Sequence, residues 1–139
     1  MPAAFRTAID RAGLEKTVYM FPSTSAPCLE GGDAAQFERW MQAIYRDAPA
    51  LGRGPRDVAR RVLGRAEPIT WDNDGRIILS QQLREAAGIT DRLTFIGVGY
   101  SFEVWNPDRL AAQDAQVDEE ALQRKLDEVG PLEDAGGQS

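Results

Sequence analysis

The residues best suited to chemistry form a short polar turn, Asp72-Asn73-Asp74-Gly75-Arg76, which precedes the apolar run Ile77-Ile78-Leu79. Gly75 permits the positive φ that a sharp turn needs, and the Asp72 carboxylate can accept hydrogen bonds from turn amides. Arg76 leaves the turn where a guanidinium on a β-ribbon can reach phosphates or guanine edges in a major groove. An ion pair between Arg76 and Asp72 that fixes the hairpin explains the same residues equally well. The residues alone leave both interpretations open.

The rest of the sequence offers few candidate catalytic residues. The chain has no histidine, which removes the usual general base and the imidazole metal ligand. Asp72 and Asp74 could act as paired carboxylates, but turn chemistry accounts for both. Cys28 is expected to be a small buried hydrophobic residue, and Gly97 and Gly99 fit a hairpin better than a phosphate-binding loop. We therefore expect no enzyme activity, no metal site and no cofactor.

A second candidate for ligand binding is a cluster of arginines in the middle of the chain. The net charge is −6, but eight acidic and two basic residues lie in 114–139, so residues 1–113 are neutral. Within that neutral body the thirteen residues 53–65 carry a charge of +4. Such a cluster can attract phosphates, although similar clusters occur on solvated helices without a ligand. The candidate phosphate contacts are Arg53, Arg56, Arg60, Arg61 and Arg65.

The elements that position these residues show an internal repeat. Residues 2–8 align with residues 80–86 at an offset of 78, and Gly13-Leu14 aligns with Gly88-Ile89 at an offset of 75. One unit is therefore expected to occur twice. Only Met1 precedes the first copy, whereas the polar turn and an apolar strand at 77–79 precede the second. We expect the first copy to begin in the middle of its unit, as an N-terminally truncated one would.

Residue patterning predicts short helices and strands in both copies. Ser80 is expected to cap a two-turn helix that Gly88 ends, and residues 2–8 should form its counterpart. Runs rich in β-branched and aromatic residues predict strands, and polar caps with apolar periodicity predict helices. The fold class is therefore α+β, mainly β with short helices. The expected strands are 17–21, 93–98 and 101–105, and further helices are expected at 33–46, 55–63, 106–112 and 118–129.

Of these helices, the one at 33–46 belongs to the first copy and the one at 55–63 connects the two copies. The first has an apolar stripe that is expected to lie in the core, formed by Phe37, Trp40, Met41, Ile44 and Tyr45. The second should turn Val58, Val62 and Leu63 inward and its arginines outward. The expected organisation is a first unit at 1–52, with its long helix at 33–46, a basic connector helix at 53–66, a second unit at 67–113 and an acidic, partly disordered tail at 114–139.

The bulk composition is that of a soluble globular protein. No apolar run approaches the roughly 20 residues that span a bilayer, so we expect no membrane role. No basic region followed by a hydrophobic stretch opens the chain, and one cysteine cannot form an internal disulfide. A cytoplasmic location is therefore expected.

Landmarks in both halves resemble the MraZ family, bacterial regulators built from two SpoVT-AbrB type swapped-hairpin units. The similarity covers about residues 1–113. In the second half it rests on the turn with residues 77–79, then Leu83-Arg84, Ala87-Gly88, residues 95–99 and residues 102–105. In the first half it rests on Pro2-Ala3-Ala4-Phe5-Arg6, Tyr19, Phe21-Pro22 and Pro27-Cys28-Leu29. The resemblance implies a double barrel of two pseudo-repeated units, the first of them incomplete.

The resemblance also implies a function. Members of this family are sequence-specific DNA-binding transcriptional regulators, chiefly repressors, of the division and cell-wall gene cluster, including their own gene. They form rings of subunits and recognise repeated boxes in double-stranded promoter DNA, so a nucleoid-associated homo-oligomer is expected. By resemblance, Arg76 and Asn73 contact DNA, while Asp72 and Gly75 shape the turn. Asp74 occupies a position that is often basic or neutral in the family, so it should weaken the turn's attraction for phosphates.

Two alternative functions belong to other classes. Without the DNA-reading turn of its first unit, the chain could serve as a ring-assembly or interaction module with weak DNA binding. An antitoxin-like protein of the same fold would also carry an acidic tail, but such proteins usually have one unit and this chain repeats its landmarks.

Overall fold

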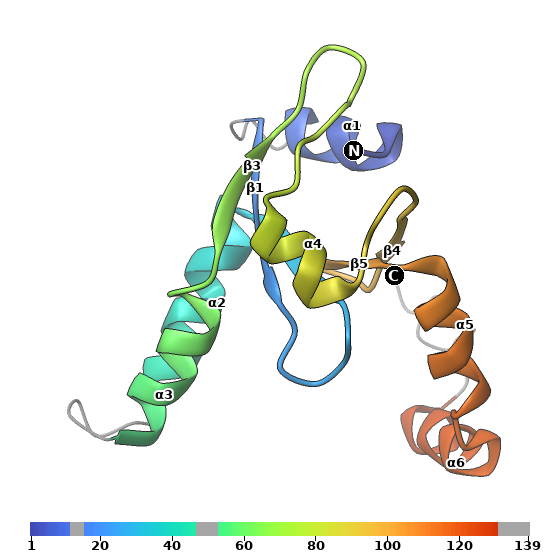
Figure 1. The fold of residues 1–139 in the computed structure, drawn as a ribbon. Coiled ribbons are helices and arrows are strands. Elements are labelled where there is room, and N and C mark those ends of the chain that lie inside the picture. Colours follow the sequence, from blue (N-terminus) through green and yellow to red (C-terminus); the bar gives the residue numbers. More distant parts are fainter. Residues whose placement is uncertain (12–15, 47–52, 131–139) are drawn as a thin grey trace. The chain divides into compact units, whose positions relative to one another are not determined.

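The computed structural model describes residues 1–11, 16–46 and 53–130, and the chain divides into unit 1, Met1–Pro107, and unit 2, Asp108–Ser139 (Figure 1). Unit 1 is a five-stranded sheet with helices, and this confirms the predicted α+β fold class. Its described helices are α1 (Ala3–Arg11), α2 (Ala34–Arg46), α3 (Arg53–Val62) and α4 (Gln81–Ala87). Its strands are β1 (Thr17–Pro22), β2 (Leu29–Asp33), β3 (Glu67–Thr70), β4 (Thr94–Gly97) and β5 (Phe102–Trp105).

The sheet joins the two halves of the chain at its centre. Its strand order is β3-β1-β2-β5-β4, and every neighbouring pair is antiparallel. In the central pair, Glu30 of β2 lies opposite Glu103 of β5. The hairpin β1–β2 and the hairpin β4–β5 flank this centre in mirrored order, and α1 and α4 begin 78 residues apart, at Ala3 and Gln81. The strand order thus agrees with a unit used twice, while the double barrel stays a prediction.

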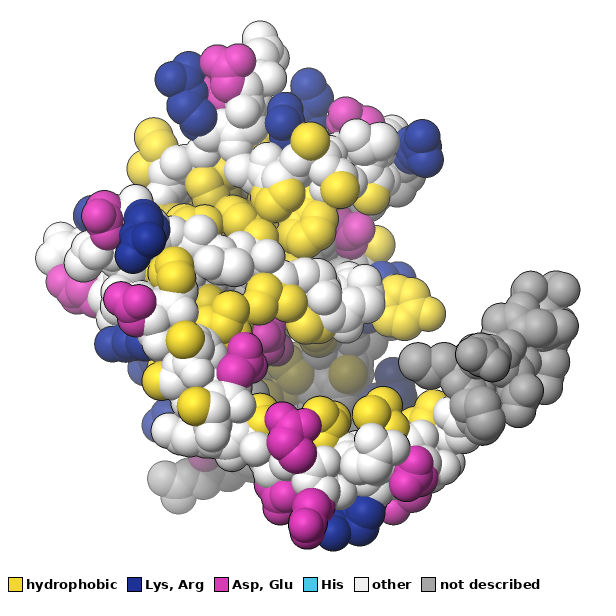
Figure 2. Space-filling view, turned by 90° about the vertical axis from the view of Figure 1, so that its right-hand side faces the viewer, with side chains coloured by type: hydrophobic (Ala, Val, Ile, Leu, Met, Phe, Trp, Pro, Cys, Tyr) yellow, Lys and Arg dark blue, Asp and Glu magenta, His cyan; other side chains and the backbone are white. Residues whose placement is uncertain are grey.

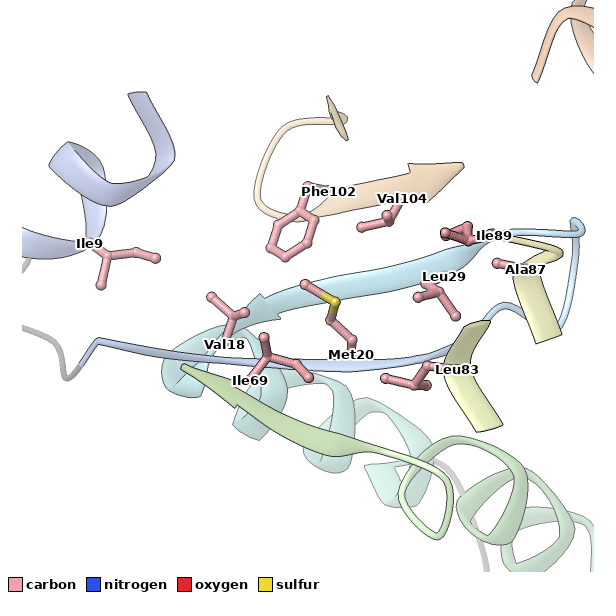
Figure 3. Close-up of a cluster of buried hydrophobic side chains, with 10 residues drawn as sticks. All are labelled: Ile9, Val18, Met20, Leu29, Ile69, Leu83, Ala87, Ile89, Phe102 and Val104. Carbon is pink, nitrogen blue, oxygen red and sulfur yellow. The ribbon is translucent and has the colours of Figure 1, made fainter. Parts of the chain in front are cut away.

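One face of the sheet carries the hydrophobic core (Figure 3). Because side chains alternate along a strand, Val18 and Met20 of β1 point to the same side of the sheet. Helix α4 covers this side with Leu83 and Ala87, both completely buried. Ser80 caps α4 by accepting a hydrogen bond from the Leu83 amide, and Gly88 ends the helix in the left-handed region, as predicted. The other core residues are Ile9, Leu29, Ile69, Ile89, Phe102 and Val104.

Helix α2 packs on the opposite face of β1. The Phe37 ring stacks on Tyr19 with ring centres 4.6 Å apart, and the Trp40 ring meets Phe21 edge to face at 5.1 Å. No residue of α2 is fully buried, and Tyr45 is exposed. The prediction that the stripe of α2 lies in the core is therefore wrong. The stripe covers the side of the sheet that carries Tyr19 and Phe21, and α3 packs against α2 without burying any of its residues fully.

Helix α3 is shorter than the predicted connector, because a turn at residues 63–65 follows Val62. Val62 is buried and Leu63 is half-buried, as expected. Val58 is 46% exposed, so its inward orientation is a wrong prediction. The reason is geometric, since only the C-terminal end of α3 lies next to the sheet (Figure 1), and Val58 comes one helical turn before Val62 at that end.

The predicted strand at residues 77–79 is also corrected. Its side chains alternate as in a strand, because Ile77 and Leu79 pack against the core while Ile78 is 87% exposed. The segment nevertheless pairs with no described strand. The reason is that a groove lies between this segment and β3, so the segment does not pair with the free edge of β3. The segment therefore keeps the alternation of a strand without its hydrogen bonds.

Unit 2 contains α5 (Pro107–Ala115), which begins at the last residue of unit 1, and α6 (Glu119–Val129). Helix α5 runs further than the predicted end at residue 112, whereas α6 agrees with the predicted charged helix. The Asp118 carboxylate caps α6 by accepting hydrogen bonds from the amides of Glu120 and Ala121. The predicted disordered end at residues 130–139 lies almost wholly outside the described residues. None of the described helices combines the length and the apolar character that crossing a bilayer requires.

Candidate nucleic-acid interface

The polar turn between β3 and α4 is closed by the Asp72 side chain. Its Oδ1 accepts hydrogen bonds from the amides of Asp74 and Arg76, both at 2.9 Å. The Gly75 amide donates to the Asp72 carbonyl at 3.0 Å, and the Asp72 amide donates to the Arg76 carbonyl at 3.1 Å. Gly75 has a φ of +79°, a conformation that favours glycine. The turn-shaping roles proposed for Asp72 and Gly75 match this geometry.

Arg76 lies at the surface of the turn and forms ion pairs within it. Its Nε donates to Oδ2 of Asp72 at 2.8 Å, and its Nη2 donates to Oδ2 of Asp74 at 3.1 Å. The Arg76 side chain is 76% exposed. Exposed ion pairs of this kind contribute only about 0–1 kcal/mol, so a ligand can displace them at little cost. The two interpretations left open by the sequence are therefore compatible, because the internal ion pair does not bury the guanidinium.

The charge state of Asp72 follows from the same contacts. The hydrogen bond from the Arg76 amide holds the pKa of Asp72 below its ordinary value, and the Arg76 side chain and the Asp74 amide act in the same direction. Partial desolvation opposes this shift. Asp72 is consequently ionised at neutral pH and keeps both of its oxygens as acceptors for the turn.

The tip of the turn is a mixed cluster of charges. Asn73, Asp74 and Arg76 are exposed, whereas Gly75 is buried beneath them. Basic and acidic side chains lie side by side at the top of the molecule in Figure 2, where this loop is found in Figure 1. A phosphate that approaches Arg76 therefore meets the Asp74 carboxylate as well.

Helix α1 of the first half lies against this turn, a contact that the sequence did not reveal. The Arg6 Nη1 donates to the Asn73 carbonyl at 3.5 Å, and the Met1 ammonium donates to the Gly75 carbonyl. A Cβ added at Gly75 would lie 2.8 Å from Cζ of Arg6. Arg6 and Asn73 are 67 residues apart, so only the paired arrangement of the two halves brings them together.

A groove opens below the turn, between its two arms. Its volume is about 630 Å³. One arm continues into β3 and pairs with β1, while the other arm follows the unpaired segment at residues 77–79. The groove is lined by Pro68, Ile69, Thr70, Trp71, Asp72, Arg76, Ile77 and Ile78.

The arginine cluster of α3 is a separate surface. Arg56, Arg60, Arg61 and Arg65 are exposed, while the side chain of Arg53 lies outside the described part of the structure. Arg60 Nη1 pairs with Oδ1 of Asp57 at 3.2 Å. Strand β3 lies between this cluster and the turn, and the six steps from residue 66 to residue 72 span about 20 Å when extended. The structure does not bring the two predicted sets of arginines together.

The described residues contain no candidate metal site, and their cysteine is not a reactive thiol. Within residues 1–11, 16–46 and 53–130, no group of three or more cysteine, aspartate or glutamate residues could hold a metal ion. Cys28 is only 1% exposed, and this confirms its predicted burial. Burial, followed by the nearby charges of Glu103 and Glu30, raises the pKa of Cys28 to about 12, so the residue remains a neutral thiol.

Comparison with known proteins places this fold among transcriptional regulators. Proteins named transcriptional regulator MraZ from Xanthobacter autotrophicus and Caulobacter vibrioides are each 33% identical to the chain over 84% of its length, covering 73% and 72% of their own lengths. A protein of the same name from Gluconacetobacter diazotrophicus is 34% identical over 91% of this chain and 79% of its own length. The chain belongs to the MraZ family.

The family model described as "MraZ protein, putative antitoxin-like" matches residues 62–129. This match includes the turn, the second hairpin and both helices of unit 2. The expectation that the family resemblance ends near residue 113 is therefore corrected, because α6 lies within the matched region.

Proposed function

We propose that the chain is a sequence-specific DNA-binding regulator that represses transcription from the promoter of the division and cell-wall gene cluster, including its own gene. The observation that carries this proposal is the exposed guanidinium of Arg76 on a turn whose backbone is fixed by Asp72 and Gly75. Repression follows when the bound protein occupies the promoter. No cofactor takes part in this mechanism.

The proposed contact is a protruding turn that enters the major groove. Arg76 donates to guanine edges or to phosphates with the fork of its guanidinium, and Asn73 at the tip supplies a neutral amide for a base edge. To do so, Arg76 gives up its exposed ion pair with Asp74, which costs little. Asp72 retains its hydrogen bonds to the turn amides, so the backbone keeps its shape during the exchange.

The proposed regulator acts as a homo-oligomer, in a ring. A single turn offers few base contacts, whereas linked copies on repeated boxes gain affinity from effective concentration. The extended segment at residues 77–79 supports assembly, because Ile78 is 87% exposed and no described strand pairs with it. Light scattering on the purified chain and on an Ile78→Lys variant tests this part. A monomeric wild-type chain contradicts it, and so does an Ile78→Lys variant of unchanged mass.

DNA binding is tested by fluorescence anisotropy with a labelled promoter duplex and a scrambled duplex of the same length. We expect Arg76→Ala to weaken promoter binding about tenfold, because a bidentate base contact contributes roughly 1–3 kcal/mol. Arg92→Ala is the matched control, since Arg92 is exposed but lies in the loop before β4. Equal binding to the two duplexes, or equal losses in the two variants, contradicts the proposal.

The arginines of α3 are proposed to add phosphate attraction that does not depend on sequence. Removing one phosphate contact lowers the slope of log K against log salt by about 0.9. Arg61→Ala is therefore expected to reduce the slope and to weaken both duplexes equally. A slope that stays unchanged in Arg56→Ala and Arg61→Ala shows that this face is solvated and binds no DNA.

A further inference from the structure

The DNA-facing turn receives little support from its own hairpin. Below the Asp72–Arg76 backbone pair, the two arms separate around the 630 Å³ groove. The arm at residues 77–79 forms no ladder with β3 or with any other described strand. A turn on divergent arms is free to tilt unless something outside the hairpin holds it.

Arg6 of α1 is placed to supply that support. Its guanidinium lies against the hydrogen face of Gly75, where an added Cβ would come within 2.8 Å of Cζ and 2.9 Å of Nε. Its Nη1 donates to the carbonyl of Asn73, the residue at the tip of the turn. Arg6 therefore contacts the backbone of the turn from the side opposite its exposed charges.

The Arg6 side chain also has unused hydrogen-bonding capacity. Its Nε is buried and has no hydrogen-bond partner among the described residues. The Nη1–Asn73 distance of 3.5 Å is at the long end for a hydrogen bond. Buried donors are normally satisfied, so the unpartnered Nε beside the turn shows that the hydrogen-bonding capacity of Arg6 at this contact is not exhausted.

We propose that Arg6 is a positioning residue that braces the turn of the second half, through the Asn73 carbonyl and contact with Gly75, and thereby sets the position of Arg76 on DNA. This inference rests on the proposed DNA-binding function for its affinity readout. Because Arg6 lies in the first half of the chain and the turn lies in the second, the first half positions the turn that is proposed to contact DNA. Arg6 acts through Arg76 and does not itself bind phosphate.

The internal repeat offers a matched control. Arg84 aligns with Arg6 at the offset of 78 residues, is exposed, and lies on α4. We expect Arg6→Ala to weaken promoter binding roughly three- to tenfold, in line with the net contribution of one ordinary hydrogen bond, since the contact is long and exposed. Arg84→Ala removes the same charge and is expected to have less than a twofold effect. Equal losses in the two variants overturn the proposal.

Two further measurements separate bracing from a direct contact. A positioning role predicts that Arg6→Ala costs nothing more in an Arg76→Ala background, whereas an independent contact gives additive losses. It also predicts an unchanged salt slope, while loss of a phosphate contact lowers the slope by about 0.9. Additive losses or a lowered slope overturn the brace.

Hydrogen exchange on the DNA-free chain tests the brace without relying on DNA binding. In Arg6→Ala, the amides of Gly75 and Arg76 are expected to exchange about threefold to tenfold faster, while those of β1 and β2 keep their rates. Arg6→Lys, which keeps a cation but loses the planar fork, is expected to restore part of the protection. Unchanged exchange at the turn overturns the brace even if the wild-type chain binds its promoter. Failure of the wild-type chain to bind DNA refutes only the proposed function.

Discussion

Replacing Asp74 by asparagine is expected to tighten DNA binding. The Asp74 carboxylate lies 3.1 Å from Arg76 Nη2 and occupies one edge of the guanidinium that is proposed to contact DNA. Asparagine has nearly the same shape and keeps an oxygen acceptor, so it removes the charge with little change in the turn. The variant therefore isolates the electrostatic cost of this carboxylate.

The size of the effect follows from the geometry. A phosphate oxygen bound to Arg76 at about 2.8 Å would place the phosphate charge roughly 6 Å from the Asp74 carboxylate. In water, two unit charges at about 6 Å repel by roughly 0.7 kcal/mol, and 0.1 M salt reduces this to about 0.4 kcal/mol. Freeing Arg76 from an exposed ion pair adds about 0–1 kcal/mol. We therefore expect about twofold to tenfold tighter binding.

Anisotropy titrations at two salt concentrations test this expectation. The gain is expected to be larger at low salt, because screening weakens the repulsion. Asp91→Asn is the matched control, since it changes the net charge equally at an exposed loop position where Thr90 Oγ1 donates to Asp91. An equal gain in both variants means that only net charge matters. Unchanged or weaker binding by Asp74→Asn shows that the turn does not approach phosphates, and refutes the reasoning.

Three further outcomes are expected. Gly75→Ala and Gly99→Ala should each lower stability by about 1–2 kcal/mol because both glycines have a positive φ. Thermal unfolding should show the larger loss for Gly75→Ala, because its added Cβ also meets Arg6, whereas Gly99 has open space around it. Because the pKa of Asp72 is lowered in the folded chain, its ionised carboxylate stabilises the fold above the ordinary aspartate pKa, and this stabilisation is lost as the pH falls through the lowered pKa. The stability of Asp72→Asn, measured by acid unfolding, should lack this pH-dependent loss. Cys28, with its pKa raised to about 12, should resist alkylation at pH 8 until denaturant is added, and rapid labelling of the folded chain would contradict its burial.

Local signals in the sequence were sufficient to predict the turn and the helix caps. Ser80 and Gly88 bound α4 as predicted, because capping depends on residues only three or four positions apart. The same applies to Asp72 and Gly75, whose hydrogen bonds and φ are properties of five consecutive residues. The exposed guanidinium of Arg76 follows from its position at the end of that turn.

Strand β2 was not predicted, because several of its residues have a low strand propensity. It contains Glu30, Gly31 and Gly32, and glycine has a low strand propensity. Its glycine is nonetheless required by packing, since a Cβ at Gly31 would lie 2.5 Å from the Phe102 ring. The internal repeat carried a usable signal, because β2 occupies the place in the first hairpin that β5 occupies in the second.

Long-range contacts account for the remaining differences. The absence of a partner for residues 77–79 depends on how the two arms of the turn separate around the groove, which no local pattern encodes. The position of Arg6 against Asn73 accompanies the pairing of β1, which follows α1, with β3, which precedes the turn. The exposure of Val58 depends on the direction in which α3 leaves the sheet. Each of these features follows from tertiary arrangement and not from neighbouring residues.

The pairing of β2 with β5 makes the two repeats cooperative partners in folding. Leu29 and Val104 face each other across this junction although 75 residues separate them, so the centre of the sheet forms only after a long loop has closed. Neither repeat supplies both central strands. A duplicated half expressed alone would present an open sheet edge to solvent and to other chains, which favours aggregation. Strands β2 and β5 therefore complete each other's hydrogen bonding, so neither hairpin has a finished inner edge without the other.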